Sequence, residues 1–417
     1  MLIIKDKVNN IDVTYIKTDK FKTVYGQIYF TAPIKKDIIT KRCLINRILV
    51  KSCKKYNTNE KLNIVNLENY GAEFESSYIG YGNSIINSFS FSCINDKYVN
   101  DNVIEKVVDT FKEILFNPNA SNNEFDKETF DLCYKVLKTE LLNEKEDTRN
   151  YCYKNMLKTL DDTKAYSYFK NLDDLEKINE KNLYEEYKNM INNSEVKLIL
   201  VGDFDYKKYA NDILKNVKSK KYNFQKYVEN RENKKEILIK KETIDCIGSV
   251  IFVGFKCFNL TKYERSYVVP IFSRILGGGA TSRCFDIIRE KESLAYYCYS
   301  KYDKADSILS VYAGIDKNNF DKVYKLILDI FNNMKEVKDE ELMIAKKDIT
   351  SSLMENYDYI SALSSLNYYK EFNEEEDLEA RIKLFNNVSI EDLKKVFKKI
   401  KADCIYFVEG NDNNEED

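Results

Sequence analysis

The sequence predicts an α+β protein built from two similar halves, each with one mixed or antiparallel sheet that carries helices on one face. Three observations predict this fold class. The chain has 417 residues, too many for one ordinary core and suited to two domains of about 200 residues each. Hydrophobic residues make up 43% of the chain, enough to fill two cores. The same order of predicted strands and helices also recurs about 210 to 220 residues later.

The first repeated element is an apolar strand that begins at a glycine. The stretch GQIYFTAP, from Gly26, matches GSVIFVGF, from Gly248, and both are rich in β-branched and aromatic residues. An amphipathic helix with a polar opening comes next, predicted over residues 100–115 and again over 318–334. The two halves therefore begin in the same way.

Long helices and a final helix–strand pair complete each half. The helical region 121–160 opens with a capping-box pattern, and its counterpart is 339–372. The last match joins residues 178–204 to residues 388–410, where an amphipathic helix precedes a strand that looks buried. The shared order of these features favours duplication over chance similarity.

The domain boundaries follow from this repeat. Residues 218–235 are dense in Lys, Asn and Glu with few apolar residues, as is typical of a linker. We therefore predict an N-terminal domain over 1–217, a linker over 218–235 and a C-terminal domain over 236–417.

Composition excludes several function classes. The chain has 66 Lys and Arg against 68 Asp and Glu, so no excess charge attracts nucleic acid or an anionic membrane. No apolar run is long enough for a membrane span, and the opening MLIIKDKVNN lacks the apolar core of a secretory signal. The ten cysteines occur singly, which is typical of reduced, packed thiols. These features predict a cytoplasmic protein.

The stretch LGGGATSRCFDIIREKESLAYYCYS, over 276–300, stands out because it holds three consecutive glycines. A phosphate loop would need Lys and then Ser or Thr after the glycines, and a dinucleotide fingerprint would need a different glycine spacing inside a βαβ unit. Local chemistry favours a flexible turn that leads into a helix capped by Thr281 or Ser282.

The same stretch resembles the signature of the C-terminal half of the insulinase-like (M16, or pitrilysin) metallopeptidases. In the N-terminal half, LENYGAEFES, over 67–76, also resembles a segment of that family. The resemblance covers essentially the whole chain and implies two tandem homologous M16-type domains, each one half of a clamshell. The matching positions in the glycine-containing stretch are Leu276, Gly277, Gly278, Ser282, Arg283, Phe285, Arg289, Glu290, Lys291, Leu294, Ala295 and Tyr296.

The zinc motif of that family, H-x-x-E-H on a helix of the N-terminal half, is absent because the chain contains no histidine. The flanking apolar residues align Cys43, Asn46 and Arg47 with the degenerate motif. Asn46 cannot act as a general base, and Arg47 would bring a permanent positive charge to the place of a dication. We expect no metal on this chain.

A replacement metal site is the alternative. Glu128, Glu140 and Glu144 lie in the helical region where the family's third zinc ligand falls, and Cys43 and Cys53 are near the degenerate motif in the sequence. Solvated helix glutamates and packed cysteines explain the same residues without a metal.

The resemblance assigns the C-terminal signature a role in the active site. It implies that Arg289 binds substrate carbonyls or orients the tyrosine, and that Tyr296 donates a hydrogen bond to the developing oxyanion. It further implies substrate binding by Gly277, Gly278, Gly279 and Ser282. The plainer interpretation is that Arg289 ends a charged helix and Tyr296 packs on a sheet.

The combined pattern resembles the inactive subunit of bacterial two-chain M16 peptidases. It predicts a chain that is no enzyme on its own and that completes the site of a zinc-bearing H-x-x-E-H homologue, with a peptide or unfolded polypeptide as substrate. A non-enzymatic peptide-binding or scaffold protein is one alternative, and an active enzyme with replacement ligands is another. The choice between heterodimer and homodimer stays open.

Overall fold

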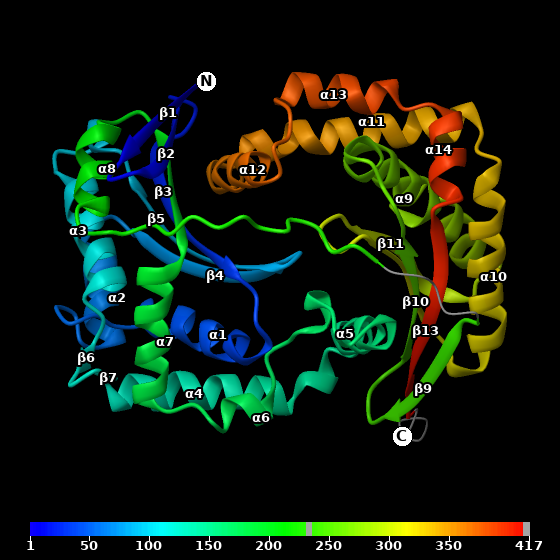
Figure 1. Ribbon diagram of the computed structural model, residues 1–417, viewed down its shortest axis with the longest axis horizontal. Coiled ribbons are helices and arrows are strands. Elements are labelled where there is room, and N and C mark those ends of the chain that lie inside the picture. Colours follow the sequence, from blue (N-terminus) through cyan, green and yellow to red (C-terminus); the bar gives the residue numbers. More distant parts are fainter. Residues whose placement is uncertain (231–235, 412–417) are drawn as a thin grey trace. The chain divides into compact units, whose positions relative to one another are not determined.

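The computed structural model describes residues 1–230 and 236–411, which divide into two compact units (Figure 1). Unit 1 consists of residues 1–142, 168–226 and 356–374. Unit 2 takes in the remaining described residues, which are 143–167, 227–230, 236–355 and 375–411.

Unit 1 contains a six-stranded sheet in the order β1-β2-β8-β3-β5-β4. Neighbouring strands run antiparallel except for the parallel pair β2–β8. A short separate hairpin joins β6 (Ala120–Ser121) to β7 (Glu124–Phe125). The strands of the main sheet are β1 (Leu2–Val8), β2 (Ile11–Lys17), β3 (Thr23–Pro33), β4 (Glu73–Tyr81), β5 (Ser84–Ile94) and β8 (Glu195–Gly202).

Unit 2 contains a five-stranded sheet in the order β11-β12-β10-β13-β9. Here too one pair, β9–β13, is parallel and the other pairs are antiparallel. The strands are β9 (Leu238–Ile244), β10 (Ser249–Cys257), β11 (Ala295–Asp303), β12 (Ile308–Ile315) and β13 (Ile400–Gly410).

The two sheets share one topology. The series β9-β13-β10-β12-β11 of unit 2 repeats the series β2-β8-β3-β5-β4 of unit 1, with the parallel pair at the same place. Only β1 has no counterpart among the described strands of unit 2. The predicted α+β class with two homologous sheets is confirmed, because chance would not reproduce both strand order and strand direction.

The helices of unit 1 are α1 (Ile39–Leu49), α2 (Asn59–Glu68), α3 (Val103–Phe116), α4 (Lys127–Leu142), α6 (Leu172–Leu175), α7 (Glu180–Asn193), α8 (Tyr206–Leu214) and α12 (Ile360–Phe372). Those of unit 2 are α5 (Thr148–Leu160), α9 (Val269–Gly277), α10 (Phe320–Asn332), α11 (Asp339–Glu355), α13 (Leu378–Asn387) and α14 (Ile390–Phe397). A π-helix, η6 (Phe285–Lys291), follows α9.

Strand β3 shows how the sheet of unit 1 is covered on both faces. Val24, Ile28 and Phe30 face the main core, which the helices of the N-terminal half complete. Tyr25 and Tyr29 point to the other face, where they belong to a smaller core with residues of α12. The prediction of helices on one face is therefore incomplete, because a helix from the C-terminal half covers the second face.

Unit 2 has the reciprocal arrangement. Ile251, Val253 and Phe255 of β10 face the main core of this unit. On the opposite face α5, from the N-terminal half, packs so closely that a side chain at Gly254 would lie 2.6 Å from the sulfur of Met156. Since the backbone approaches this closely, only glycine fits at that position.

The exchanged helices occupy equivalent places in the repeat, since α5 follows α4 and α12 follows α11. The compact units consequently differ from the contiguous domains 1–217 and 236–417, because residues 143–167 and 356–374 each pack on the sheet of the other half. Each exchanged helix covers an apolar or aromatic sheet face that would otherwise meet water.

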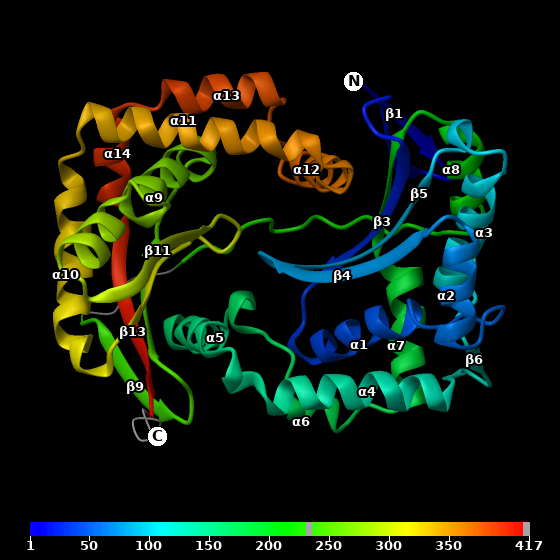
Figure 2. The ribbon, with the colours of Figure 1, turned by 180° about the vertical axis from the view of Figure 1, so that it is seen from behind.

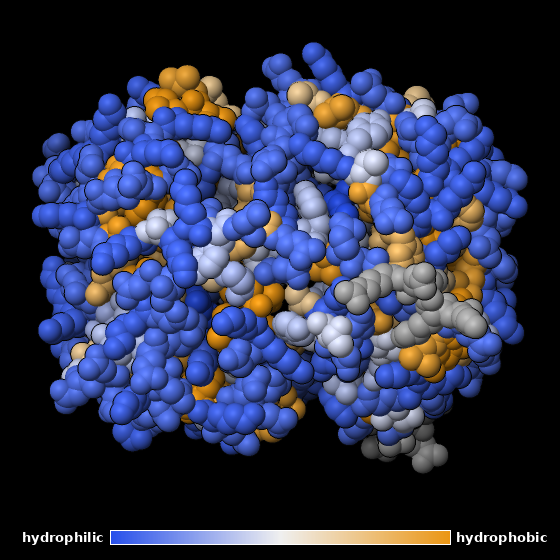
Figure 3. Space-filling view, in the orientation of Figure 1, coloured by the Kyte–Doolittle hydropathy of each residue, from blue (hydrophilic) through white to orange (hydrophobic). Residues whose placement is uncertain are grey.

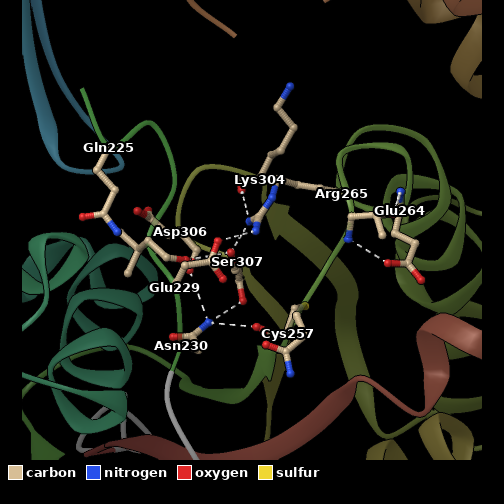
Figure 4. A network of polar contacts seen from close by, with 12 residues as sticks. Gln225, Glu229, Asn230, Cys257, Glu264, Arg265, Lys304, Asp306 and Ser307 are labelled. Carbon is tan, nitrogen blue, oxygen red and sulfur yellow. Dashed lines mark hydrogen bonds and ion pairs between the residues drawn. The ribbon is translucent and has the colours of Figure 1, made fainter. Parts of the chain in front are cut away.

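The predicted linker, 218–235, contains no helix or strand over 218–230, and residues 231–235 lie outside the described residues. Residues 227–230 are nevertheless bound to unit 2. Asn230 donates a side-chain hydrogen bond to the carbonyl of Ser307 at 2.8 Å, and buried Arg265 holds Glu229 at 3.0 Å (Figure 4). This end of the linker is fixed by polar contacts.

The face of the molecule drawn in Figure 3 is largely hydrophilic. On the face drawn in Figure 3, apolar residues form small separate patches among polar ones, as expected from a chain with 32% charged residues. None of the helices within 1–230 and 236–411 has the length and apolarity needed to cross a membrane.

Candidate functional site

The three residues that we aligned with the zinc motif lie on α1, and two of them are buried. Cys43 and Asn46 are 2% and 3% exposed, because they fall on the helix face that packs toward the core. The Asn46 amide donates to the carbonyl of Ser77 on β4 at 2.6 Å, and its oxygen accepts from Asn87 of β5 at 2.5 Å. Asn46 thus ties α1 to two strands of the sheet.

Arg47, the third position, forms a bidentate ion pair with Glu140 of α4. The two guanidinium nitrogens lie 2.8 Å and 2.6 Å from the two carboxylate oxygens. Lys170 adds a second cation 3.1 Å from the same carboxylate. The hydrogen bonds from Arg47 are the main reason that the pKa of Glu140 lies below its usual value, and the same bonds raise the pKa of Arg47.

Glu140 is thus the predicted glutamate that meets the degenerate motif, and the other two do not. Glu128 is exposed near the start of α4, and Glu144 pairs with Lys154 in unit 2. The sequence could not select among the three glutamates, because helix position alone does not determine which one faces α1.

The residues at this site do not fit a zinc ion. A guanidinium supplies five donors and no lone pair for a metal, and its charge repels a dication. Across the described ranges, no group of three or more Cys, Asp or Glu side chains is arranged to hold a metal. The ten cysteines are all free thiols, and nine of them are buried.

A buried ion pair on the same helix was missed by our sequence prediction. Arg42 is 1% exposed and its Nε lies 2.6 Å from a carboxylate oxygen of Glu186 on α7. Helical spacing could have revealed it, because Arg42 shares a face with the buried residues Asn46 and Leu49. Two charged groups remain in this core because each satisfies the other.

The glycine stretch of unit 2 forms a packed turn after α9. A side chain at Gly277 would lie 2.6 Å from the backbone nitrogen of Ser300, so the glycine permits close approach to β11. Ser282 is buried and donates to the carbonyl of Gly279 at 2.5 Å. Arg274 donates to the carbonyl of Gly278 and pairs with Asp348.

These contacts explain the turn without a ligand. They agree with the prediction of a turn that leads into a helix, but this turn is packed and is held by Arg274 and Ser282. Substrate binding by Gly277, Gly278, Gly279 and Ser282 stays a prediction.

Arg289 lies on η6, a π-helix, which is a rare conformation that is frequent at functional sites. Its guanidinium carbon is 4.7 Å from the ring centre of Phe285, and its Nε is 3.7 Å from a carboxylate oxygen of Glu290. The side chain is 42% exposed. It is therefore a loosely held cation on the surface of unit 2.

Tyr296 occupies a β-bulge in the edge strand β11. Ala295 pairs with Ile315 and Tyr297 pairs with Gly314, so the register with β12 shifts by one residue at Tyr296. Bulges bend a strand and redirect a side chain, and they are common beside active sites. The residue is 67% exposed, and its hydroxyl donates to a carboxylate oxygen of Asp316 at 3.0 Å.

Comparisons with known proteins agree with this geometry. Residues 177–348 match the family model described as "Peptidase M16 inactive domain". The "Probable inactive metalloprotease YmfF" of Bacillus subtilis is 26% identical over 98% of both chains.

Solved structures share the fold over nearly the whole chain. A conserved protein from Enterococcus faecalis superposes with a TM-score of 0.90 at 24% identity, covering 99% of this chain and 100% of its own. A peptidase M16 inactive domain from Pseudomonas fluorescens gives a TM-score of 0.78 at 14% identity, with 99% of each chain covered. Residues 177–348 thus match the peptidase M16 inactive domain, and the fold of the whole chain is similar to that of an M16 inactive-domain structure.

Proposed function

We propose that this chain is the non-catalytic subunit of a two-chain M16-type peptidase and lends Arg289 and Tyr296 to the site of a zinc-bearing H-x-x-E-H homologue. The zinc then belongs to the partner chain and the substrate is a peptide or unfolded polypeptide. Cytoplasmic localisation remains part of this proposal.

The observation that carries the proposal is the contrast between the two motif regions. Arg47 and Glu140 neutralise each other at the position that we aligned with the zinc motif, which supports a chain without zinc chemistry of its own. Tyr296 and Arg289, by comparison, are exposed on a bulge and a π-helix. Exposed polar side chains on irregular backbone favour a role in binding over a role in packing.

The chemistry assigned to this chain is electrostatic. A tyrosine hydroxyl that donates to the carbonyl oxygen of a scissile peptide stabilises the negative charge that develops there, and loss of one such donor typically costs about 10²- to 10³-fold in turnover. Donation to substrate requires that the hydroxyl leave Asp316, its acceptor in this structure. Arg289, always charged, can bind backbone carbonyls of the same peptide.

The proposal is tested in two steps. Affinity purification of the tagged protein from its own cells, with mass spectrometry and zinc quantification, should recover an H-x-x-E-H protein with one zinc. The recovered pair should then hydrolyse an unstructured peptide, and Tyr296→Phe should reduce turnover about 100-fold. Tyr299→Phe, on the same strand, is the matched control and should leave turnover unchanged.

Two results would overturn the proposal. The protein could be recovered alone and without zinc, or the pair could retain full turnover with Phe at position 296.

A non-enzymatic peptide-binding role is the second candidate. It is favoured by β4 and β11, which are the outer strands of their sheets and leave one side without a partner strand among the described residues. Such an edge can accept an extended peptide as an added strand. This candidate predicts peptide binding without turnover, whether or not a partner is present.

A further inference from the structure

A pocket of about 220 Å³ lies on the second face of the unit 1 sheet, beside the edge strand β4. Tyr25 of β3 and two serines of β5, Ser90 and Ser92, line it together with two glutamates of β4, Glu73 and Glu75. The first turn of the exchanged helix α12 supplies the remaining wall. Since one liquid water takes about 30 Å³, the pocket has room for the end of a long side chain.

Strand register brings these groups together. Glu73 pairs with Ser92 and Glu75 pairs with Ser90, so both carboxylates project from the same face of the sheet. Tyr25, opposite Ser92 on the next strand, lies on that face as well. Three adjacent strands therefore present oxygen atoms to one volume.

The side chains that line the pocket carry a net negative charge. Glu73 and Glu75 are exposed, and neither forms an ion pair within the described part of the chain. The lining contains no lysine or arginine. Burial raises the pKa of Tyr25, so its phenol stays neutral at physiological pH. The start of α12 favours nearby carboxylates, because the N-terminal end of a helix carries partial positive charge.

The location of the pocket defines the form of the ligand. Strand β4 is the last strand of the sheet (Figure 2), so one of its sides has no partner strand among residues 1–230 and 236–411. An extended peptide on this edge would point alternate side chains to the face that carries Glu73 and Glu75. A basic extended peptide would pair its backbone with β4 and would also balance the charge of Glu73 and Glu75.

We propose that this pocket binds the side chain of a Lys or Arg residue in an extended peptide that pairs with the edge of β4. Glu73 and Glu75 accept hydrogen bonds from the ammonium or guanidinium group, and the hydroxyls of Tyr25 and Ser90 lie within the same polar surface. The inference rests on the peptide binding proposed above and adds a preference for basic residues.

Charged residues on an edge strand have a second possible role, which is to prevent pairing between copies of the chain. That role concerns solubility and predicts no preference between peptides. The experiment must therefore compare ligands as well as variants.

The test uses fluorescence anisotropy with labelled, unstructured peptides that bear one Lys or one Arg, and with matched peptides that carry norleucine or citrulline instead. The full-length protein should bind the basic peptides about tenfold more tightly than the neutral ones, and added salt should reduce this ratio. Glu73→Gln combined with Glu75→Gln should abolish the preference. Glu60→Gln combined with Glu124→Gln, two exposed glutamates elsewhere in unit 1, makes the same change in net charge and should preserve it.

The possible failures are distinguishable. Equal binding of basic and neutral peptides, or an equal loss of preference in both double variants, would overturn the pocket while leaving the proposed function intact. Self-association of the Glu73/Glu75 variant with unchanged peptide preference would also overturn it, in favour of edge protection. Absence of binding to every peptide, with or without a zinc-bearing partner, would count against the proposed function itself.

Discussion

The two motif regions of this protein have opposite characters. On α1, in unit 1, Asn46 and Arg47 are fully engaged by neighbouring strands and by Glu140. In unit 2, the side chain of Arg289 is 42% exposed and Tyr296 is 67% exposed. The side chains that we aligned with the zinc motif are therefore mostly part of the packing of unit 1, whereas the two residues of the C-terminal signature lie at the surface of unit 2. The difference shows that a polar side chain on a helix packed between other elements is used for structure, while one on an edge strand or irregular helix stays accessible to solvent.

The largest expected effect concerns the buried end of α1. Arg42→Met should lower the free energy of unfolding of unit 1 by about 3–5 kcal/mol, because it leaves the Glu186 carboxylate buried without its partner. Arg289→Met, at an exposed position, should change stability by less than about 0.5 kcal/mol. Urea unfolding followed by circular dichroism measures both.

The double variant Arg42→Met, Glu186→Leu is the control for this comparison. It removes both charges and should recover much of the lost stability. If Arg42→Met and Arg289→Met were equally mild, the contrast between the two regions would not hold.

The glycines of unit 2 provide a test of intermediate size. Gly277→Ala should destabilise unit 2 by about 1–3 kcal/mol, because the new carbon would meet the backbone of β11 at Ser300. Gly279→Ala should cost less than about 0.5 kcal/mol, since its new carbon would meet only the movable end of Arg274. Thermal melts of the two variants give the comparison. A larger cost at Gly279 would contradict the packing explanation.

The smallest expected effect is the coupling between Arg47 and Glu140. A double-mutant cycle with alanine should give about 0.5–1 kcal/mol at pH 7, because both side chains are partly exposed and the pair is screened by solvent. The folded-state pKa of Glu140 is lowered, so this coupling is complete above the unfolded value of about 4.3 and is lost as pH falls through the folded value. The same cycle at pH 3 should therefore give a smaller coupling than at pH 7. Equal coupling at the two pH values would show that packing, and not the ion pair, joins α1 to α4.

Much of the fold could be predicted from residue patterns. The apolar strands β3 and β10, the amphipathic helices α3 and α10 and the final helix–strand pairs all lie where the repeat predicted them. These signals are local, so they can be recognised without knowing which elements pack together. The degenerate motif was also visible, because absence of histidine is a property of composition.

The contacts of the candidate site residues could not be predicted, because they depend on which elements pack together in the folded chain. Nothing in the sequence shows that Glu140 and not Glu128 faces Arg47, since both lie on α4. The bulge at Tyr296 is equally hidden, because it arises from the register between β11 and β12.

By itself, then, the sequence determined the duplicated α+β architecture and the absence of histidine ligands for zinc. Both follow from periodicity and composition, which can be read without knowledge of the tertiary contacts. Only the tertiary structure decided that α5 and α12 are exchanged between the sheets, that Arg47 meets Glu140, and that Glu73 and Glu75 share a pocket with Tyr25. The physical reason is that an apolar face or a charged group specifies the kind of partner that it needs. The choice among several suitable partners is made by the free energy of the whole packed chain.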